Sequence, residues 1–344
     1  MVMLHAQNSF SKIENLHIYG NPYAAGSFFI SSGQEALSNI TFKRLLLENR
    51  ISMGELLKWG MRLYNFRYGI LQGVKIYGIN KEHPLYFNLE GGVEIQGCHL
   101  ADAGAQGVQI AWRSIETNNP TGWSITGIQR LNRTVIEKCG QPRGYGRASF
   151  AASFFGKQNN PTTDSNGVVK NGPRTRWDCP VELLDTRIVH DSLGQYELRG
   201  ALLCEHRPSI RILGGEINYN GLADRDLCHI YKTDEVLIDA CRIEGQRFVD
   251  ITGAQTVRIT NCTGNARVRI NGVVVGKVSE GYTTDDALSI VGPGPGLEDA
   301  GEYASMRADS GTCSTFQCRK TEESVSDYAD RVAFGDDGEV AEAA

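Results

Sequence analysis

The chain has 344 residues, of which 41% are hydrophobic and 22% are charged, and its formal net charge is -5. This composition is typical of a globular protein that is long enough to bury a large core. No apolar run approaches the roughly 20 residues of a membrane span, and the first ten residues lack the basic flank and apolar stretch of a secretory signal. We therefore expect neither membrane insertion nor a signal peptide.

A short pattern recurs along residues 13–279. It consists of an aliphatic residue, any residue, a second aliphatic residue, two further residues, and then a small or apolar residue. Copies begin at Leu16, Ile40, Val74, Val93, Thr134, Val181, Ile210, Val236 and Val257. The first two positions alternate with period two, which predicts a short strand with both side chains on one face. Val108-x-Ile110 and Phe154 with Phe155 are candidates for further strands in the two widest intervals.

The alternation breaks once in each copy, which predicts a tight corner just before the third inward position. The corner residues are Gly20, Arg44, Gly78, Gly97, Lys138, Asp185, Gly214, Ala240 and Asn261. Six of these nine residues are Gly, Asn or Asp, which adopt positive φ most readily. A second strand follows the corner in many copies, because the pattern resumes with Leu47, Leu100, Ile188, Ile217 or Ile243.

Two segments interrupt the strand pattern. Residues 51–64 contain a capping box, Ser52 with Glu55, followed by apolar residues at helical spacing, which predicts a short helical insertion. Residues 140–176 are rich in Gly, Asn, Pro and basic residues, and we interpret them as a long loop.

The charge is divided unevenly along the chain. From Glu280 to the end there are 15 acidic and 4 basic residues, whereas residues 1–279 contain 25 acidic and 31 basic residues. The terminal part is also poor in residues that could build a core. We therefore predict a repetitive body over residues 1–279 and an acidic C-terminal segment over residues 280–344 that is mobile or ordered by a partner.

Starts 19 and 21 residues apart match one turn of a strand solenoid, and the period-two unit excludes helical repeats. The V-x-I-x-x-C units with Gly or Asn corners resemble the right-handed parallel β-helix superfamily, which includes pectate lyases, other polysaccharide-active enzymes and viral tailspikes. The resemblance covers roughly residues 13–279. It implies an all-β right-handed parallel β-helix that acts on or binds polysaccharide.

The strand before each unit supplies the candidate functional side chains. Counting back seven and five residues from a unit gives two outward positions, and neighbouring strands lie about 4.8 Å apart. The aligned pairs are Arg67 with Gly69, Tyr86 with Asn88, Arg174 with Arg176, Leu203 with Glu205, His229 with Tyr231, and Asp250 with Thr252. They predict a polar stripe with acidic, basic and aromatic members, although outward charges on a solenoid are also commonly solvated without a function.

Two reactions fit this stripe. Glycoside hydrolysis needs two carboxylates roughly 5 to 9.5 Å apart. Glu205 and Asp250 would lie about 9.6 Å apart along the axis, with Asp226 and Glu216 as alternates. Elimination on an acidic sugar needs a proton acceptor and a cation that neutralises the sugar carboxylate. We predict Glu205, Asp250 and His229 as catalytic residues, and Arg174, Arg176, Tyr231 and Tyr86 as substrate-binding residues.

The cysteines and charges exclude other classes of site. Cys98, Cys139, Cys241 and Cys262 take the third inward position of their copies, which indicates small apolar filler in a core. No histidine recurs beside them at ligand spacing, so we expect no metal and no cofactor. Basic and aromatic residues are not interleaved on one element, and we therefore expect no nucleic-acid partner.

Three functions remain open. The first is a phage tailspike-like virion protein, assembled as a homotrimer with other virion proteins, that binds a host surface polysaccharide and cleaves it if it is an enzyme. The lack of a secretory signal and the reduced cysteines favour a product that is assembled inside the cell, and hence this function. If the protein is viral, we expect it in the virion tail; otherwise its location stays open. The second is a bacterial polysaccharide lyase or glycoside hydrolase that acts as a monomer. The third is a non-catalytic structural β-helix.

Overall fold

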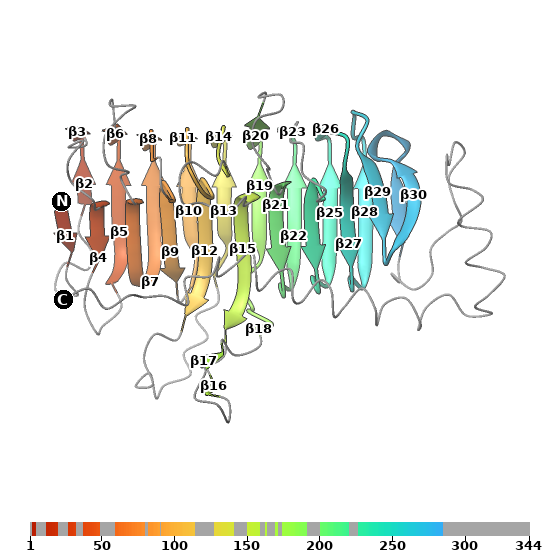
Figure 1. The fold of residues 1–344 in the computed structure, drawn as a ribbon, viewed down its shortest axis with the longest axis horizontal. Helices are drawn as coiled ribbons and strands as arrows, with labels where there is room; N and C mark the ends of the chain where they lie inside the picture. The colour runs from red at the N-terminus through yellow and green to blue at the C-terminus, as the bar shows by residue number, and fades with distance from the viewer. Residues whose placement is uncertain are drawn as a thin grey trace.

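The computed structural model describes residues 2–4, 12–19, 27–31, 37–48, 59–79, 82–89, 91–113, 127–140, 150–158, 162–163, 169–170, 174–190, 200–219 and 226–284. These residues form an all-β protein with long parallel sheets, shown in Figure 1 with the longest axis horizontal. Within the described ranges the one helical element is a 3-10 turn at Val278–Glu280, and no helix there is long and apolar enough to cross a membrane.

The smaller of the two long sheets has eight strands, and every neighbouring pair is parallel. In chain order the strands are β3 (His17–Tyr19), β6 (Leu46–Glu48), β8 (Lys75–Tyr77), β11 (His99–Ala101), β14 (Val135–Glu137), β20 (Arg187–His190), β23 (Glu216–Tyr219) and β26 (Arg242–Glu244).

The larger sheet contains two parallel rows of strands. The first row is β2 (Lys12–Glu14), β5 (Leu37–Lys43), β7 (Trp59–Gln72), β10 (Val93–Gln96), β13 (Gln129–Asn132), β19 (Val181–Leu184), β22 (Ser209–Leu213), β25 (Glu235–Asp239) and β28 (Thr256–Thr260). An antiparallel strand, β31 (Tyr282–Thr284), ends it.

The second row is β1 (Val2–Leu4), β4 (Ser27–Ser31), β7, β9 (Leu85–Leu89), β12 (Val108–Arg113), β15 (Phe150–Gln158), β21 (Gly200–Glu205), β24 (Cys228–Tyr231), β27 (Phe248–Thr252) and β29 (Arg267–Ile270), with antiparallel β30 (Val273–Lys277) at its end. Strand β7 pairs in both rows and so joins them. Short β18 (Arg174–Thr175) pairs antiparallel with β15, and β16 (Thr162–Thr163) pairs with β17 (Val169–Lys170).

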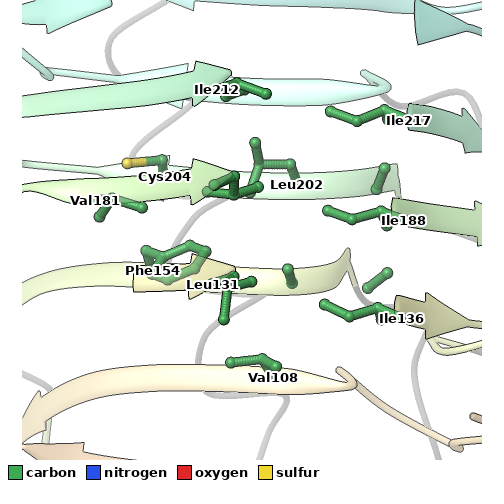
Figure 2. Close-up of a cluster of buried hydrophobic side chains, with 14 of the residues drawn as sticks. Val108, Leu131, Ile136, Phe154, Val181, Ile188, Leu202, Cys204, Ile212 and Ile217 are labelled. Atoms are coloured by element: carbon green, nitrogen blue, oxygen red, sulfur yellow. The ribbon is translucent and has the colours of Figure 1, made fainter. Parts of the chain in front are cut away.

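Every second residue of each row points into one continuous apolar core. Leu131, Ile136 and Leu202 come from three different rows, and all three are fully buried in the same cluster (Figure 2). Because the strands of a row are in register, aliphatic side chains stack on aliphatic side chains from β19 to β28, as in Val181, Ile210, Val236 and Val257. Burial of this apolar surface is the main stabilising contribution, at roughly 25 cal/mol per Å².

The predicted corners are confirmed by their backbone conformation. The eight corner residues that the structure describes have φ between 46° and 72°, and they are Arg44, Gly78, Gly97, Lys138, Asp185, Gly214, Ala240 and Asn261. Gly20 lies outside the described residues. Two-residue connections from the first row of the large sheet to the eight-stranded sheet occur at Arg44, Gly97, Asp185, Gly214 and Ala240, where the break in the alternation marks a change of sheet. Gly78 and Lys138 instead follow strands of the eight-stranded sheet.

The phase of the repeat is wrong in three of its nine copies. Ile18, Ile76 and Ile136 belong to the eight-stranded sheet, whereas their supposed equivalents such as Ile95 belong to the first row of the large sheet. The reason is that strands of both rows have aliphatic residues at period two and are followed by a left-handed corner. A single copy therefore does not show to which row it belongs.

This change of phase alters the interpretation of the cysteines. Cys98, Thr134, Thr186 and Cys262 occupy the same position, directly after the left-handed corner residue. The thiol or hydroxyl of each lies within hydrogen-bonding distance of two backbone carbonyl oxygens. One belongs to the residue two places earlier, and the other to the preceding strand of the same row. Cys139 instead follows β14, at the other corner. The seven cysteines among the described residues are buried and unpaired as disulfides, and burial raises the pKa of Cys98 to about 12. They are core thiols in their neutral form.

The predicted helix is wrong over residues 59–64, which begin strand β7; residues 51–58 lie outside the described residues. Met61 and Leu63 point into the core while Arg62 is half-buried, so the burial alternates with period two. A Cβ on Gly60 would lie 2.5 Å from the carbonyl oxygen of Pro84, which shows how closely the segment before β9 approaches β7. Pairing with two parallel neighbours outweighs the local helix signal.

The other two boundaries also shift. Residues 150–158, inside the predicted loop of 140–176, form core strand β15, with Phe154 and Phe155 buried as the strand hypothesis expected. The described fold continues to Thr284, five residues beyond the predicted end of the body. The acidic segment from residue 285 onward lies outside the described residues.

Candidate functional site

The polar stripe predicted from the sequence occupies the outward face of the second row. Leu203, His229 and Asp250 are paired in register on β21, β24 and β27. Glu205, Tyr231 and Thr252 form the adjacent column in the same strands. The predicted alignment of these three coils is therefore confirmed.

The alignment of the arginine pair is wrong. Ser153 on β15, not a residue near Arg174, is the register partner of Leu203. Arg174 comes from the antiparallel strand β18, and its guanidinium lies 4.2 Å from the centre of the Phe155 ring. Arg174 therefore reaches the stripe from β18, a short antiparallel strand beside β15, and not from a parallel strand of the second row.

The stripe is buried, contrary to the expectation that outward charges are solvated. Glu205, His229 and Asp250 are each 1% exposed, and every residue of β21 and β24 is buried. Buried ionised groups are tolerated when they are paired and hydrogen-bonded. The charged side chains of this face therefore compensate one another through ion pairs and have to be considered together.

Four of these charges form a compact group that we call the quartet: Asp226, His229, Asp250 and Arg269. His229 Nδ1 lies 3.4 Å from Oδ2 of both aspartates. Arg269, the register partner of Asp250 on β29, donates through Nε to Asp250 Oδ1 at 2.6 Å and through its terminal nitrogen to Asp226 Oδ1 at 2.8 Å. Each aspartate is thus shared by an imidazole and a guanidinium.

The quartet shifts the protonation of its own members. Burial alone would lower the pKa of His229, but its contacts with Asp226 and Asp250 outweigh that and raise the pKa to about 9. Burial would raise the pKa of Asp250, and the hydrogen bonds of His229 and Arg269 lower it below its ordinary value instead. At neutral pH the quartet therefore holds two negative and two positive charges.

The quartet is accessible at one side. The side chains of Asp226 and Arg269 are 19% and 29% exposed, whereas those of His229 and Asp250 are 1% and 2% exposed. The guanidinium groups of Arg269 and Arg267 lie 4.8 and 4.7 Å from the centre of the Phe248 ring. A ligand would thus meet the Asp226 carboxylate and a pair of arginines, with the imidazole beneath them.

The donor atoms of Asp226, His229 and Asp250 lie within 4.8 Å of one another, which is the spacing of a metal site. Arg269 already donates to both carboxylates, and a divalent cation would have to displace this guanidinium and the proton of the His229 imidazole. The residues are therefore better suited to an ion-paired site than to a metal centre.

Glu205 and Asp250, the predicted carboxylate pair, lie two strands apart in adjacent columns of the stripe. Their catalytic role stays a prediction. Glu205 forms a buried ion pair with Arg174. Each carboxylate is held on its own column by its own arginine.

The remaining predicted residues lie around the quartet or away from it. The Tyr231 ring, 2% exposed, stacks on His229 with ring centres 6.3 Å apart. Arg176 is half exposed and bonds Asp178 and Asp234. Tyr86 is in the same column as His229 but four strands away, roughly 19 Å along the row.

The two alternate carboxylates lie in different sheets of the protein or beside them. Asp226 belongs to the quartet, whereas Glu216 lies on β23 in the eight-stranded sheet. Arg269 was missed by the sequence analysis because β29 follows the last clean unit of the repeat. Extending the outward alignment one strand beyond Asp250 would have found it.

Comparisons of the chain with protein-family models, with curated proteins and with solved structures gave no match.

Proposed function

We propose that the chain is a right-handed parallel β-helix. Three observations support the proposal: strands of successive repeats pair in parallel, they fall into three rows, and left-handed corners two residues long connect the first row to the eight-stranded sheet. The right-handed sense follows from the strong preference of parallel crossovers for that hand. The chain is then a solenoid whose outward faces present side chains at regular intervals.

We further propose that this β-helix is a tailspike-like protein that binds a surface polysaccharide at the quartet. The observation that carries the proposal is the group of His229, Asp250 and Arg269 on successive strands, with Asp226 just before the first of them, and with one side accessible. Carboxylate and guanidinium groups are planar and make paired hydrogen bonds, which suits adjacent sugar hydroxyls. The second arginine, Arg267, adds a positive charge and favours a polysaccharide that contains acidic sugars.

The quartet also contains the groups that a depolymerising reaction needs. His229 is protonated below about pH 9 and is a proton donor, whereas Asp226 is an accessible carboxylate that accepts a proton. In an elimination, Asp226 would take the proton from the carbon next to the sugar carboxylate, and Arg269 would stabilise the negative charge that develops. A carbon–carbon double bond would form as the bond from the neighbouring carbon to the glycosidic oxygen breaks, and His229 would give its proton to that oxygen. We therefore favour elimination over hydrolysis if the protein cleaves its ligand.

One observation favours the rival function of a non-catalytic structural β-helix. His229 and Asp250 are 1% exposed, and the charges of the quartet balance one another. A purely structural quartet would lock neighbouring strands together without any ligand. This function and the polysaccharide-binding function make different predictions for an accessible member such as Asp226.

The test is a screen of the purified protein on immobilised acidic and neutral surface polysaccharides, with reducing-end and ultraviolet readouts for hydrolysis and elimination. Wild type should bind an acidic polysaccharide, and Asp226→Asn should weaken that binding at least tenfold while the protein stays folded. The matched control is Asp239→Asn on β25, because that carboxylate also accepts two side-chain hydrogen bonds but lies in the other row. Absence of binding by folded wild type, or equal binding by both variants, would refute the site.

The mass in solution separates the two polysaccharide-active functions. The tailspike proposal requires a trimer, as β-helices of that kind associate side by side, and it places the protein in the virion tail. A stable monomer that generates unsaturated sugar ends would instead favour a bacterial polysaccharide lyase.

A further inference from the structure

A hollow of about 370 Å³ lies on the outward face of the eight-stranded sheet, which is a different face from that of the quartet. Strands β14, β20 and β23 line it. The side chains that matter are two valines, Val135 and Val189, and four polar residues, Glu137, Arg187, Glu216 and Asn218. The volume is near the lower end of the roughly 300 to 1,000 Å³ typical of small-molecule sites.

The hollow results from the register of the three strands. Val135 has Arg187 as its register partner, and Val189 has Glu137 and Asn218 as partners on its two sides. The two valines therefore occupy diagonal positions among longer side chains. A short branched side chain cannot fill the space between longer neighbours on an outward face, so the valines form a recessed apolar floor with a polar rim.

The rim is polar and carries charges of both signs. Arg187 donates to Glu216 through Nε at 3.2 Å and through a terminal nitrogen at 3.1 Å, and its side chain is 54% exposed. On the other side, Glu137 Oε2 lies 3.2 Å from His99 Nε2. Each carboxylate keeps further acceptor capacity, since an ionised carboxylate has about four acceptor positions. Arg242 and Lys138 also lie 3.9 Å from Glu216 and 3.8 Å from Glu137, respectively. The rim thus offers both hydrogen-bond donors and acceptors.

We propose that this hollow binds a neutral sugar ring, such as one or two hexose residues of a polysaccharide. The apolar floor would contact the C–H face of the ring, and the carboxylates, the guanidinium and the amide would bond its hydroxyls. The paired carboxylates at the rim disfavour phosphates and acidic sugars, because a negative ligand would lie beside Glu137 and Glu216. This proposal does not depend on the quartet, which lies on another row and carries the acidic-sugar proposal.

The test is saturation-transfer NMR of the full chain with glucose, galactose, mannose and lactose, each added separately at millimolar concentration. At least one sugar should receive saturation from the protein, and Val189→Phe, which fills the hollow, should reduce the signal at least tenfold. Val135→Phe repeats the test from the neighbouring strand in case the first variant does not fold. The control is Leu46→Phe, an outward aliphatic residue in the same column as Val135 but three strands away, which should leave the signal unchanged.

Asp226→Asn separates this proposal from that of the quartet, because it should leave binding of the neutral sugar at wild-type strength. Lack of transfer to all four sugars would overturn the proposal, as would wild-type signals in a folded Val189→Phe variant. Loss of the signal in Asp226→Asn with an unchanged signal in Val189→Phe would assign the sugar to the quartet and would also overturn it.

Discussion

The protonation of His229 makes a prediction about stability against pH. Its pKa is about 9 in the folded protein and roughly 6.5 in an unfolded chain. Because the folded pKa is the higher one, the stabilisation is fully present below about pH 6.5 and is lost as the pH rises through about 9. A difference of this size corresponds to about 3 kcal/mol of unfolding free energy.

The assay is urea unfolding at steps between pH 6.5 and 9.5, for wild type and for His229→Gln. Glutamine cannot be protonated, so the variant should lack about 3 kcal/mol of the decline that wild type shows. The buried thiols ionise on unfolding in both proteins, and the difference between the two curves therefore isolates the imidazole. The control variant His17→Gln, in an exposed side chain on β3, should retain the wild-type decline. Parallel curves for wild type and His229→Gln, or an NMR titration of His229 near pH 6.5, would refute the reasoning.

Two further predictions test the packing around the site and the corners. Glu205→Gln should destabilise the protein by about 3 to 5 kcal/mol in urea unfolding, because it leaves the buried Arg174 guanidinium without this carboxylate; a change under 1 kcal/mol would show that the pair is not needed. Gly97→Ala should cost only about 1 kcal/mol, since its Cβ would meet no atom within 4 Å and only the left-handed backbone opposes it. Gly215→Ala should cost far more, because its Cβ would lie 2.2 Å from the carbonyl oxygen of Thr186. Equal costs at the two glycines would contradict the corner geometry.

The corners and the alternation of the fold follow from the sequence because their causes are local. A left-handed corner favours Gly or Asn, and residues such as Gly97 and Asn261 report it directly. The phase of the repeat has a non-local cause. Whether Ile76 pairs with Leu100 or with Ile95 depends on the row to which its strand belongs. The few residues of one copy do not specify that row.

The helix predicted at residues 51–64 is a second case in which the local sequence does not determine the structure. The capping box lies before Trp59, and the following residues are compatible with either helix or strand when only a few turns are considered. Strand β7 is selected by its parallel neighbours β4, β5, β9 and β10, which come from segments before and after it. Pairing of this kind is set by the whole fold rather than by local preference.

The candidate site also contains features that follow from the local sequence and features that depend on the whole fold. The register of His229 with Asp250 follows from a constant number of residues between each strand and its repeat unit. The ion pairs do not, because Arg174 arrives on an antiparallel strand and Arg269 on a strand beyond the last unit. The sequence thus shows which side chains face outward, while their pairing and burial depend on segments that interrupt or follow the repeat.

We propose that the accessible edge of the quartet binds an acidic polysaccharide. Calorimetric titration of the protein with a purified oligomer of a uronic acid tests it most directly, with wild type compared against Arg269→Gln and against Arg258→Gln on β28, an arginine of the other row. We expect one binding site per chain in wild type and in Arg258→Gln, and at least tenfold weaker binding in folded Arg269→Gln. Equal affinity of all three proteins, or no heat of binding in wild type, would contradict it.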